Sequence, residues 1–480
     1  MKIIGREKEQ LKLQAIYNSK KPELVVVKGR RRVGKTYLIN NTFNNNFSFK
    51  YTGISPIDLN ENKESKLKQQ IDSFYISLLK YGYKGNKPTS WLEAFYCLEV
   101  LLETKRSDER MVVFIDELPW LDTHKSNFIS SFENFWNNWG STNENLMLIV
   151  CGSSNSWIND NLLNNYGGLY DRVTKIIDLS PFSLQETKEY FEYNNIVFSN
   201  YDIVQSYMIF GGIPFYLDLL NPALSLVQNV NELFFNKNAI LKNEFNQLFR
   251  SAFKNPEEVK KIVLSLSKNR LGLTKKEISK ETKISDGGTL TSFLQSLIAS
   301  NIIIKYTPFD KNKNEHYYKL IDQFCLFYIH FVKDNNSLDN TFWQDNITSQ
   351  NVVSWRGFSF ENVCFYHIDK IKDVLRIAGL TTNISAFNYS GGDDESGSQI
   401  DLLIVRKDNI VDVCEIKFYG LPYSVTQNDI NKIKERELLI SNKISKKYAI
   451  HHILIASYGV KKNEYSNYFQ NIITIDDLLK

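Results

Sequence analysis

Short apolar runs alternate with stretches of helical period along the first 180 residues. Three runs are rich in β-branched or aliphatic side chains and predict buried strands at Leu24–Val27, Met111–Ile115 and Leu146–Val150. Strands that alternate with helices are typical of a parallel sheet with helices on its faces. We therefore expect an α/β core over residues 1–180.

The pattern changes after Ser180–Ser183. Helical periodicity then continues to about residue 255 and predicts a helical lid over residues 181–255. Residues 256–320 predict three helices followed by a β-hairpin, which is the outline of a winged helix-turn-helix. Residues 321–480 form the last predicted domain, so the chain is an α/β multidomain protein, as its 480 residues allow.

The first predicted strand leads into a loop that fits phosphate binding. Its residues follow the pattern G-x-x-x-x-G-K-[ST] and are Gly29, Arg30, Arg31, Arg32, Val33, Gly34, Lys35 and Thr36. The two glycines lack a Cβ, so backbone N–H groups can wrap closely around phosphates. Lys35 can reach the β- and γ-phosphates, and Thr36 can offer a hydroxyl to Mg²⁺. A strand before the loop and a helix after it predict a P-loop core that binds ATP or GTP.

The second predicted strand ends in two acids. Asp116 at the strand tip is expected to hold Mg²⁺ as a Walker B acid, and Glu117 to polarise the attacking water. The third strand ends in Ser153 and Ser154, either of which can sense the γ-phosphate or merely form a turn.

One arginine lies where it could assist hydrolysis. Arg172 is a candidate arginine finger, acting in cis or from a neighbouring subunit, because such a residue neutralises charge in the transition state. An ordinary surface arginine explains the same position equally well. Oligomeric state, including a homo-oligomer, stays open at this level.

Composition narrows the class of protein without naming a partner. No apolar run approaches the roughly 18 residues of a membrane span, so no membrane association is expected. The five cysteines are scattered without a CxxC pair, which is typical of reduced core residues in a cytoplasmic protein. A formal net charge of +4 is too small to indicate a partner.

The predicted winged helix is more basic than the chain as a whole. It carries 12 Lys and Arg against 7 Asp and Glu. Its would-be recognition helix, Gly287–Ser300, has no Lys or Arg with which to read base edges. We therefore favour a structural or protein-contacting role, with nonspecific phosphate contact through Lys311 and Lys313 as the alternative.

A second group of charged residues lies in the C-terminal third. Asp401 falls on one predicted strand, and Glu415 and Lys417 share a face of the next strand because alternate side chains point the same way. Two acids and an ammonium suit Mg²⁺- or Mn²⁺-dependent cleavage of a phosphodiester. Glu361 on an upstream helix could complete the metal cluster. A solvated amphipathic hairpin is the alternative interpretation.

Together these motifs resemble the AAA+-related STAND ATPases of archaea and bacteria that carry a C-terminal PD-(D/E)XK nuclease-like domain. The resemblance covers nearly the whole chain and rests on Ile4–Glu7, Gly29–Thr36, Ile115–Trp120, Cys151–Ser154, Gly211–Pro214, Asp322–Tyr328, Trp355–Glu361 and Cys414–Lys417. It implies a restriction-endonuclease-like fold for residues 321–480. It also implies metal-binding or catalytic roles for Glu361, Asp401, Glu415 and Lys417.

The resemblance also implies ATP as the nucleotide, and no guanine-specifying N-K-x-D motif opposes this. Two features depart from the family. Asp171 stands before Arg172 where a small residue is usual, and the acidic stretch 391–397 precedes Asp401.

The leading hypothesis is an ATP-driven switch coupled to a metal-dependent nuclease, with DNA favoured over RNA. A signalling ATPase with a non-catalytic, partner-binding C-terminal domain is the first alternative. A DNA-binding regulator that acts through the winged helix is the second.

Overall fold

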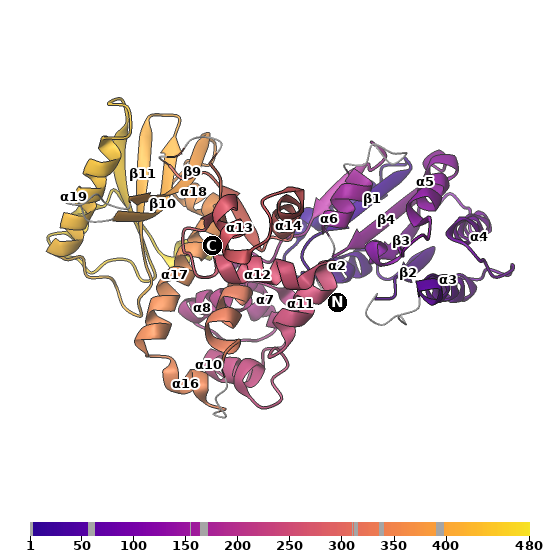
Figure 1. Cartoon of the computed structure of the whole chain (residues 1–480), viewed down its shortest axis with the longest axis horizontal. Coiled ribbons are helices and arrows are strands. Elements are labelled where there is room, and N and C mark those ends of the chain that lie inside the picture. The colour runs from indigo at the N-terminus through magenta and orange to yellow at the C-terminus, as the bar shows by residue number, and fades with distance from the viewer. Residues whose placement is uncertain are drawn as a thin grey trace. The chain divides into compact units, whose positions relative to one another are not determined.

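The chain divides into two compact units. A computed structural model describes residues 3–55, 63–153, 155–163, 171–309, 311, 315–335, 340–389 and 398–480. Unit 1 comprises Met1–Pro181 and Gln247–Pro256, and unit 2 comprises Phe182–Asn246 and Glu257–Lys480. Figure 1 labels many of their elements. The predicted lid region therefore packs mainly within unit 2.

Unit 1 is built on a five-stranded sheet in the order β2-β3-β4-β1-β5. Every neighbouring pair is parallel. Its strands are β1 Glu23–Lys28, β2 Phe49–Thr52, β3 Met111–Asp116, β4 Leu146–Gly152 and β5 Lys175–Asp178. The predicted parallel α/β core is confirmed. Because β1, β3 and β4 run the same way, the segments that follow them emerge at one edge of the sheet.

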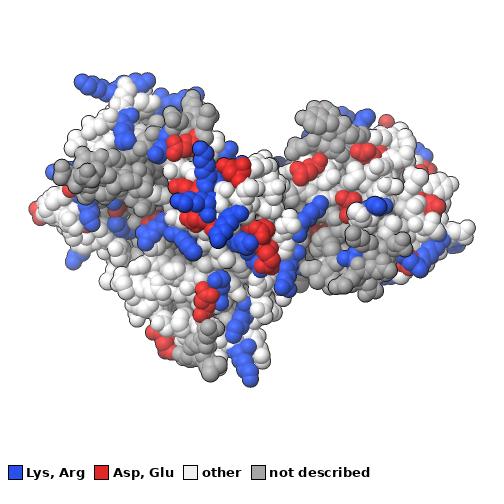
Figure 2. Space-filling view, viewed as in Figure 1, with Lys and Arg blue, Asp and Glu red and all other residues white. Residues whose placement is uncertain are grey.

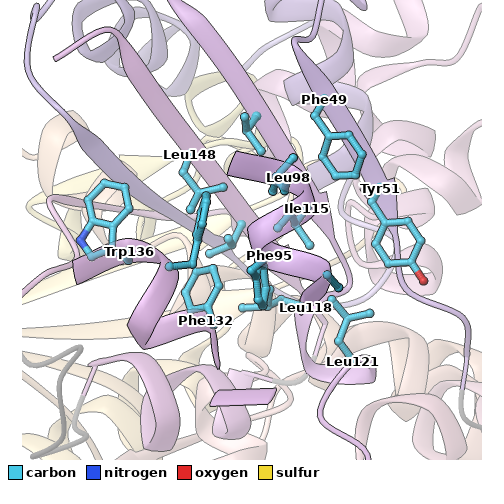
Figure 3. Close-up of a cluster of buried hydrophobic side chains, with 14 of the residues drawn as sticks. Phe49, Tyr51, Phe95, Leu98, Ile115, Leu118, Leu121, Phe132, Trp136 and Leu148 are labelled. Atoms are coloured by element: carbon cyan, nitrogen blue, oxygen red, sulfur yellow. The ribbon is translucent and has the colours of Figure 1, made fainter. Parts of the chain in front are cut away.

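The helices of unit 1 pack large aromatic side chains against this sheet. Within residues 3–181 they are α1 Glu7–Tyr17, α2 Lys35–Thr42, α3 Lys63–Lys80, α4 Trp91–Glu103, α5 Phe128–Asn138 and α6 Asn155–Ile158. Figure 3 shows Phe95 of α4 and Phe132 of α5 beside Ile115 and Leu148 of the sheet, all buried. Burying each such side chain contributes roughly 1.5–3 kcal/mol. This packing holds the strand ends in place.

The helical part of unit 2 is assembled from two distant stretches of chain. The first stretch holds α7 Leu184–Tyr193, α8 Asn200–Phe210, α9 Pro214–Leu217, α10 Leu226–Val230 and the start of α11 Glu244–Ala252. The second holds α15 Gln323–Phe327, α16 Phe342–Asn346, α17 Gln350–Tyr366 and α18 Ile368–Val374. Helix α8 packs against α15 and α17. Its residues 203–210 are all buried, as expected of a helix surrounded by others.

Residues 256–320 form helices and a small antiparallel sheet. The helices are α12 Pro256–Leu266, α13 Lys275–Thr282 and α14 Gly288–Ala299. The strands β6 Leu273–Thr274, β7 Ile303–Tyr306 and β8 Tyr317–Leu320 lie in the order β6-β8-β7. The three helices and the hairpin match the sequence prediction. The two-residue strand β6 was missed because it is too short to show a period. Lys313 lies outside the described residues.

The C-terminal part of unit 2 is a mixed sheet in the order β13-β12-β11-β10-β9. Its strands are β9 Thr382–Tyr389, β10 Ser398–Arg406, β11 Ile410–Lys417, β12 Ala449–Ala456 and β13 Asn471–Ile473. Strands β9, β10 and β11 are antiparallel, whereas β11, β12 and β13 are parallel. Helix α19, Gln427–Ser441, packs Ile440 against Val411 and Val413, and α20 spans Ile475–Leu478.

The sequence also led to expectations about membrane-spanning helices and about the cysteines. Among the described residues, no helix has both the length and the apolar character to cross a membrane. All five cysteines are buried, as expected of core residues. On the face drawn in Figure 2, acidic side chains lie among the Lys and Arg side chains, so the visible basic residues do not form one uninterrupted surface.

Candidate nucleotide site and C-terminal charged cluster

The loop between β1 and α2 wraps tightly at its two glycines. Gly29 has φ +150° and Gly34 has φ +90°, and Gly34 caps the N-terminus of α2. A Cβ on Gly29 would lie 2.2 Å from the carbonyl oxygen of Leu179, so no larger residue fits there. The Gly29 N–H donates to Oδ1 of Asn155 at 3.0 Å. At Gly29 the loop is thus confined by the backbone of Leu179 and hydrogen-bonded by the side chain of Asn155.

Lys35 is buried and folded back onto the loop. Its ammonium donates to the carbonyl oxygens of Gly29, at 2.9 Å, and Arg30, at 3.1 Å. These bonds hold the positive charge within the curve of the loop. A phosphate entering the loop would meet this charge together with the N-terminal end of α2, which also favours anions.

Thr36 and Asp116 meet directly. Thr36 Oγ1 donates to Asp116 Oδ2 at 2.7 Å, while Oδ1 accepts from the Glu117 N–H at 2.9 Å and from the Cys151 thiol at 2.6 Å. Burial raises the pKa of Cys151, so the thiol stays protonated and able to donate. A hydroxyl beside a carboxylate is the oxygen donor set that suits Mg²⁺ in a P-loop site. The residues present therefore fit the predicted ion.

Glu117 is held by Ser153. Both the N–H and the hydroxyl of Ser153 donate to Glu117 Oε2, each at 3.0 Å. Burial raises the pKa of Glu117, and the Lys35 ammonium and the two Ser153 bonds only partly oppose the shift. Glu117 also has a left-handed backbone with φ +49°, a strained conformation that recurs at functional sites. In this state Glu117 is tied to the neighbouring strand.

Two site residues escaped the sequence predictions. Asn155 is buried at the start of α6 and contacts the Gly29 N–H. Arg6 is buried and donates to the carbonyl oxygens of Val33, at 3.4 Å, and Ser180, at 2.7 Å. The position of Asn155 just after the Ser153 turn was the only available signal, and Arg6 appeared only within a resemblance motif.

The remaining predicted residues of unit 1 differ in burial. Arg30 is buried, Arg31 and Arg32 are half-buried, and Arg32 has φ +72°. Arg172 is exposed in the segment before β5. Ser154 lies outside the described residues. The role of Arg172 as an arginine finger stays a prediction.

The C-terminal cluster contains a residue that the sequence had not singled out. Glu415 Oε1 pairs with the Lys417 ammonium at 2.6 Å, as expected for neighbours on one face of β11. Oε2 of Glu415 pairs with Arg436 from α19. Both carboxylate oxygens therefore already have a cationic partner. Arg436 lies 21 positions after Glu415, so no motif connected the two.

For Asp401 and Glu361, the other two predicted metal ligands, the structure gives the position on their strand or helix. In the antiparallel pair of β10 and β11, Leu402 lies opposite Cys414, which directly precedes Glu415. Asp401 directly precedes Leu402 on β10. The Asp401 side chain lies outside the described part of the chain. Glu361 is half-buried on α17, a helix that packs on β11. Among the described side chains, no three His, Cys, Asp or Glu residues are grouped to hold a metal ion.

Comparison with known proteins defines the class. Residues 3–220 match the model of a family described as an ATPase domain predominantly from Archaea. With the loop, Asp116 and Glu117 in the geometry above, this part of the chain is an ATP-binding and ATP-hydrolysing P-loop ATPase domain, similar to the archaeal one. The match ends before the C-terminal mixed sheet, so that sheet remains of unassigned type.

Individual relatives are distant. An uncharacterized protein of Methanocaldococcus jannaschii is 26% identical over 367 residues, which cover 75% of this chain and 76% of the relative. A Walker-type ATPase of Pyrococcus abyssi is 20% identical, with a TM-score of 0.46 over 68% of this chain and 96% of that chain. The ORC2 protein of Aeropyrum pernix is 12% identical, with a TM-score of 0.41 over 72% of this chain and 96% of that chain.

Proposed function

We propose that this chain is a Mg²⁺-dependent ATP switch whose C-terminal sheet is a nuclease-like domain acting on nucleic acid, with DNA favoured over RNA. The observation that carries the switch is that the phosphate-binding Lys35 and the metal-binding Thr36 are both engaged in bonds within the protein. ATP binding offers the Lys35 ammonium charged phosphate oxygens in place of neutral carbonyl oxygens, and the accompanying Mg²⁺ would take the hydroxyl oxygen of Thr36. The two bonded arrangements are the two states of the switch.

Glu117 extends this switch to the hydrolysis step. Its carboxylate must turn toward a water molecule to assist attack on the γ-phosphate. While Ser153 donates two hydrogen bonds to Oε2, the carboxylate is turned to β4. A ligand shifts such an equilibrium only through its differential affinity for the two states. We propose that the γ-phosphate supplies this difference by recruiting Ser153.

The nuclease proposal is supported by the types of residue that β10, β11 and α17 carry. Carboxylates such as Asp401, Glu415 and Glu361 would hold a divalent ion, Mg²⁺ or Mn²⁺, which stabilises the charge that develops during phosphodiester cleavage. Lys417 would add a further positive charge beside the scissile phosphate. The Glu415 pair with Arg436 must open before that carboxylate can bind the ion.

Coupling between the two sites has a covalent route. The polypeptide passes from one unit to the other after Pro181, after Asn246 and after Pro256. A rearrangement of the P-loop domain can therefore act on both ends of residues 182–246. We propose that the winged-helix region, residues 256–320, follows this movement and contacts a protein partner. Arg172 would act in trans if the active form is a homo-oligomer.

A second candidate function has its own supporting observation. Lys417 and Arg436 neutralise Glu415 from both sides, which suits a structural ion pair better than an open metal ligand. The chain would then be a signalling ATPase, and its C-terminal sheet would bind a partner without cleaving anything.

One cleavage assay separates the two candidates. Purified protein is mixed with plasmid, single-stranded DNA or RNA, with Mg²⁺ or Mn²⁺, and with or without ATP. Cutting by the wild type but not by a Glu415→Ala, Lys417→Ala double variant supports the nuclease. Loss of the ATP effect in Lys35→Ala supports the coupling. No cutting under any condition, with ATP hydrolysis intact, contradicts the nuclease and leaves the signalling ATPase.

The Arg436→Gln variant sharpens this comparison. It removes the second cationic partner of Glu415 but leaves Lys417 in place. If the Arg436 pair only masks a metal ligand, Mn²⁺ binding tightens in this variant while the fold is kept. If the pair is structural, the variant loses stability and gains no affinity for Mn²⁺.

A further inference from the structure

Two tyrosine rings are stacked on the loop that follows β11. Tyr419 and Tyr423 have ring centroids 5.4 Å apart and planes only 14° apart. The side chain of Tyr419 is 46% exposed, and the intervening Leu421 is 76% exposed. The loop starts two residues after Lys417, so the rings lie next to the charged cluster in the chain.

The loop is fixed by backbone hydrogen bonds to the segment after β12. The Tyr419 N–H donates to Ser457 Oγ at 2.9 Å, and the same hydroxyl donates to the Tyr419 carbonyl oxygen at 2.6 Å. The Tyr423 N–H donates to Gly459 O at 2.9 Å, and the Lys461 N–H donates to Tyr423 O at 2.8 Å. Ser457 is buried, so the anchor is shielded from water. The exposed ring of Tyr419 is thus held in place on a rigid loop.

Lysine and acidic side chains lie near the two stacked rings. The Lys417 ammonium lies 5.8 Å from the centroid of the Tyr423 ring. Lys461 and Lys462 are exposed just beyond the backbone anchor. Of the nearby acids, Glu415 is paired with Lys417, and Asp429 is hydrogen-bonded by Tyr423 and Thr426. These acids are therefore engaged within the protein. Lys417 shares its charge with Glu415 beside the Tyr423 ring, and the exposed Lys461 and Lys462 add positive charge on the anchoring segment.

We propose that Tyr419 and Tyr423 form a stacking platform for an unpaired base of single-stranded nucleic acid, whose phosphates pass Lys417. Aromatic faces stack on bases of any sequence, and bordering cations attract the backbone. A base inside a duplex cannot reach such a platform, because both of its faces are already stacked. The platform thus names the substrate class of the proposed nuclease, and its catalytic meaning rests on that proposed function.

The experiment compares two oligonucleotides that carry the same phosphates. Full-length protein in EDTA is titrated by fluorescence anisotropy into labelled oligothymidine of about 20 nucleotides and into an abasic strand of equal length. Base stacking should make the wild type bind oligothymidine about ten-fold more tightly than the abasic strand. Tyr419→Ala should lose this preference, Tyr419→Phe should keep it, and binding to the abasic strand should hardly change.

Tyr193→Ala is the matched control. Tyr193 is 49% exposed, lies in the same unit and belongs to α7, away from the loop in sequence. Thermal unfolding and ATP hydrolysis of each variant check that the fold is intact. Equal loss in Tyr193→Ala would assign the effect to general damage and overturn the platform.

The remaining outcomes separate this proposal from the nuclease proposal. A base preference that depends on Tyr419 in a protein that never cleaves supports the platform and contradicts the nuclease. Cleavage that depends on Glu415 and Lys417, without any base preference, supports the nuclease and overturns the platform. Equal binding of both strands by the wild type also overturns it, and then a protein partner fits the exposed rings better.

Discussion

The hydroxyl of Thr36 donates a 2.7 Å hydrogen bond to Asp116, a residue 80 positions away in the chain. This bond brings the loop after β1 and the tip of β3 to one point. Both oxygens are typical ligands of Mg²⁺, and in the present state they bind each other. The bond therefore marks where the metal would enter and what it would displace.

Thr36→Ala should remove one metal contact and leave the fold intact. We expect kcat for ATP hydrolysis to fall by at least about 100-fold, the scale on which a single transition-state contact acts. Thr36→Ser keeps the hydroxyl and should retain most of the activity. Steady-state hydrolysis measured across a Mg²⁺ titration distinguishes the two variants. Equal activity in all three proteins would remove Thr36 from the metal site.

Glu117→Gln should uncouple nucleotide binding from hydrolysis. The amide cannot accept a proton from water, so kcat should drop about 10²- to 10⁴-fold while ATP binding persists. Nucleotide affinity by calorimetry and turnover in the same buffer provide the two readouts. A parallel loss of affinity would mean that Glu117 supports the loop instead of the water.

The pH profile of hydrolysis should reflect the surroundings of Glu117. Burial raises the pKa of Glu117, so the base becomes protonated and activity declines at a higher pH than an exposed glutamate would allow. Ser153→Ala removes the hydroxyl bond that lowers this pKa and keeps the N–H bond. The acidic limb of kcat/KM, which reports the free enzyme, should therefore move further toward neutral pH in the variant. An unchanged limb would show that another group controls it.

Substitutions at the two glycines of the loop should differ in severity. Gly29→Ala places a Cβ 2.2 Å from Leu179 O, so we expect a loss of about 3 kcal/mol or more in unfolding free energy. Gly34→Ala meets no heavy atom within 4 Å and carries only the strain of φ +90°, about 1–2 kcal/mol. Chemical denaturation of both variants, monitored in unit 1, tests the order. The reverse order would contradict the close approach of Leu179 to the loop.

His367 should make unit 2 sensitive to mild acid. Burial lowers its pKa from 6.5 to about 4, partly opposed by the bond to Val363 O, and its Nε2 accepts from the Leu184 N–H at 3.1 Å. Below pH 6.5 the unfolded state binds a proton that the folded state refuses, so stability falls as the pH drops from 6.5 toward 4. The full effect is about 3 kcal/mol.

His367→Gln is the control for this titration. The amide oxygen can still accept from Leu184, but it does not titrate. The difference in unfolding free energy between pH 7 and pH 4 should shrink by about the same 3 kcal/mol. If the variant and the wild type lose stability in parallel, the acid sensitivity has another source.

Local patterns were sufficient for the elements that carry the ATPase chemistry. Strands β1, β3 and β4 are continuous apolar runs, and each is followed by residues predicted to serve the loop, the metal or the water. A parallel sheet then aligns the ends of these strands at one edge. Type and position of Lys35, Thr36, Asp116 and Glu117 therefore followed from sequence alone.

The partners of those residues required the tertiary structure. The bond from Ser153 to Glu117 depends on β3 lying beside β4, and the pairing of Arg436 with Glu415 depends on α19 packing over β11. Hydrophobic periodicity reports which face of an element is buried but not which element covers it. The sequence by itself thus determined the chemical groups and their local frames. Only the tertiary structure decided which groups bind one another. Side-chain hydrogen bonds and ion pairs form within about 4 Å, and the packing of strands and helices determines which side chains come that close.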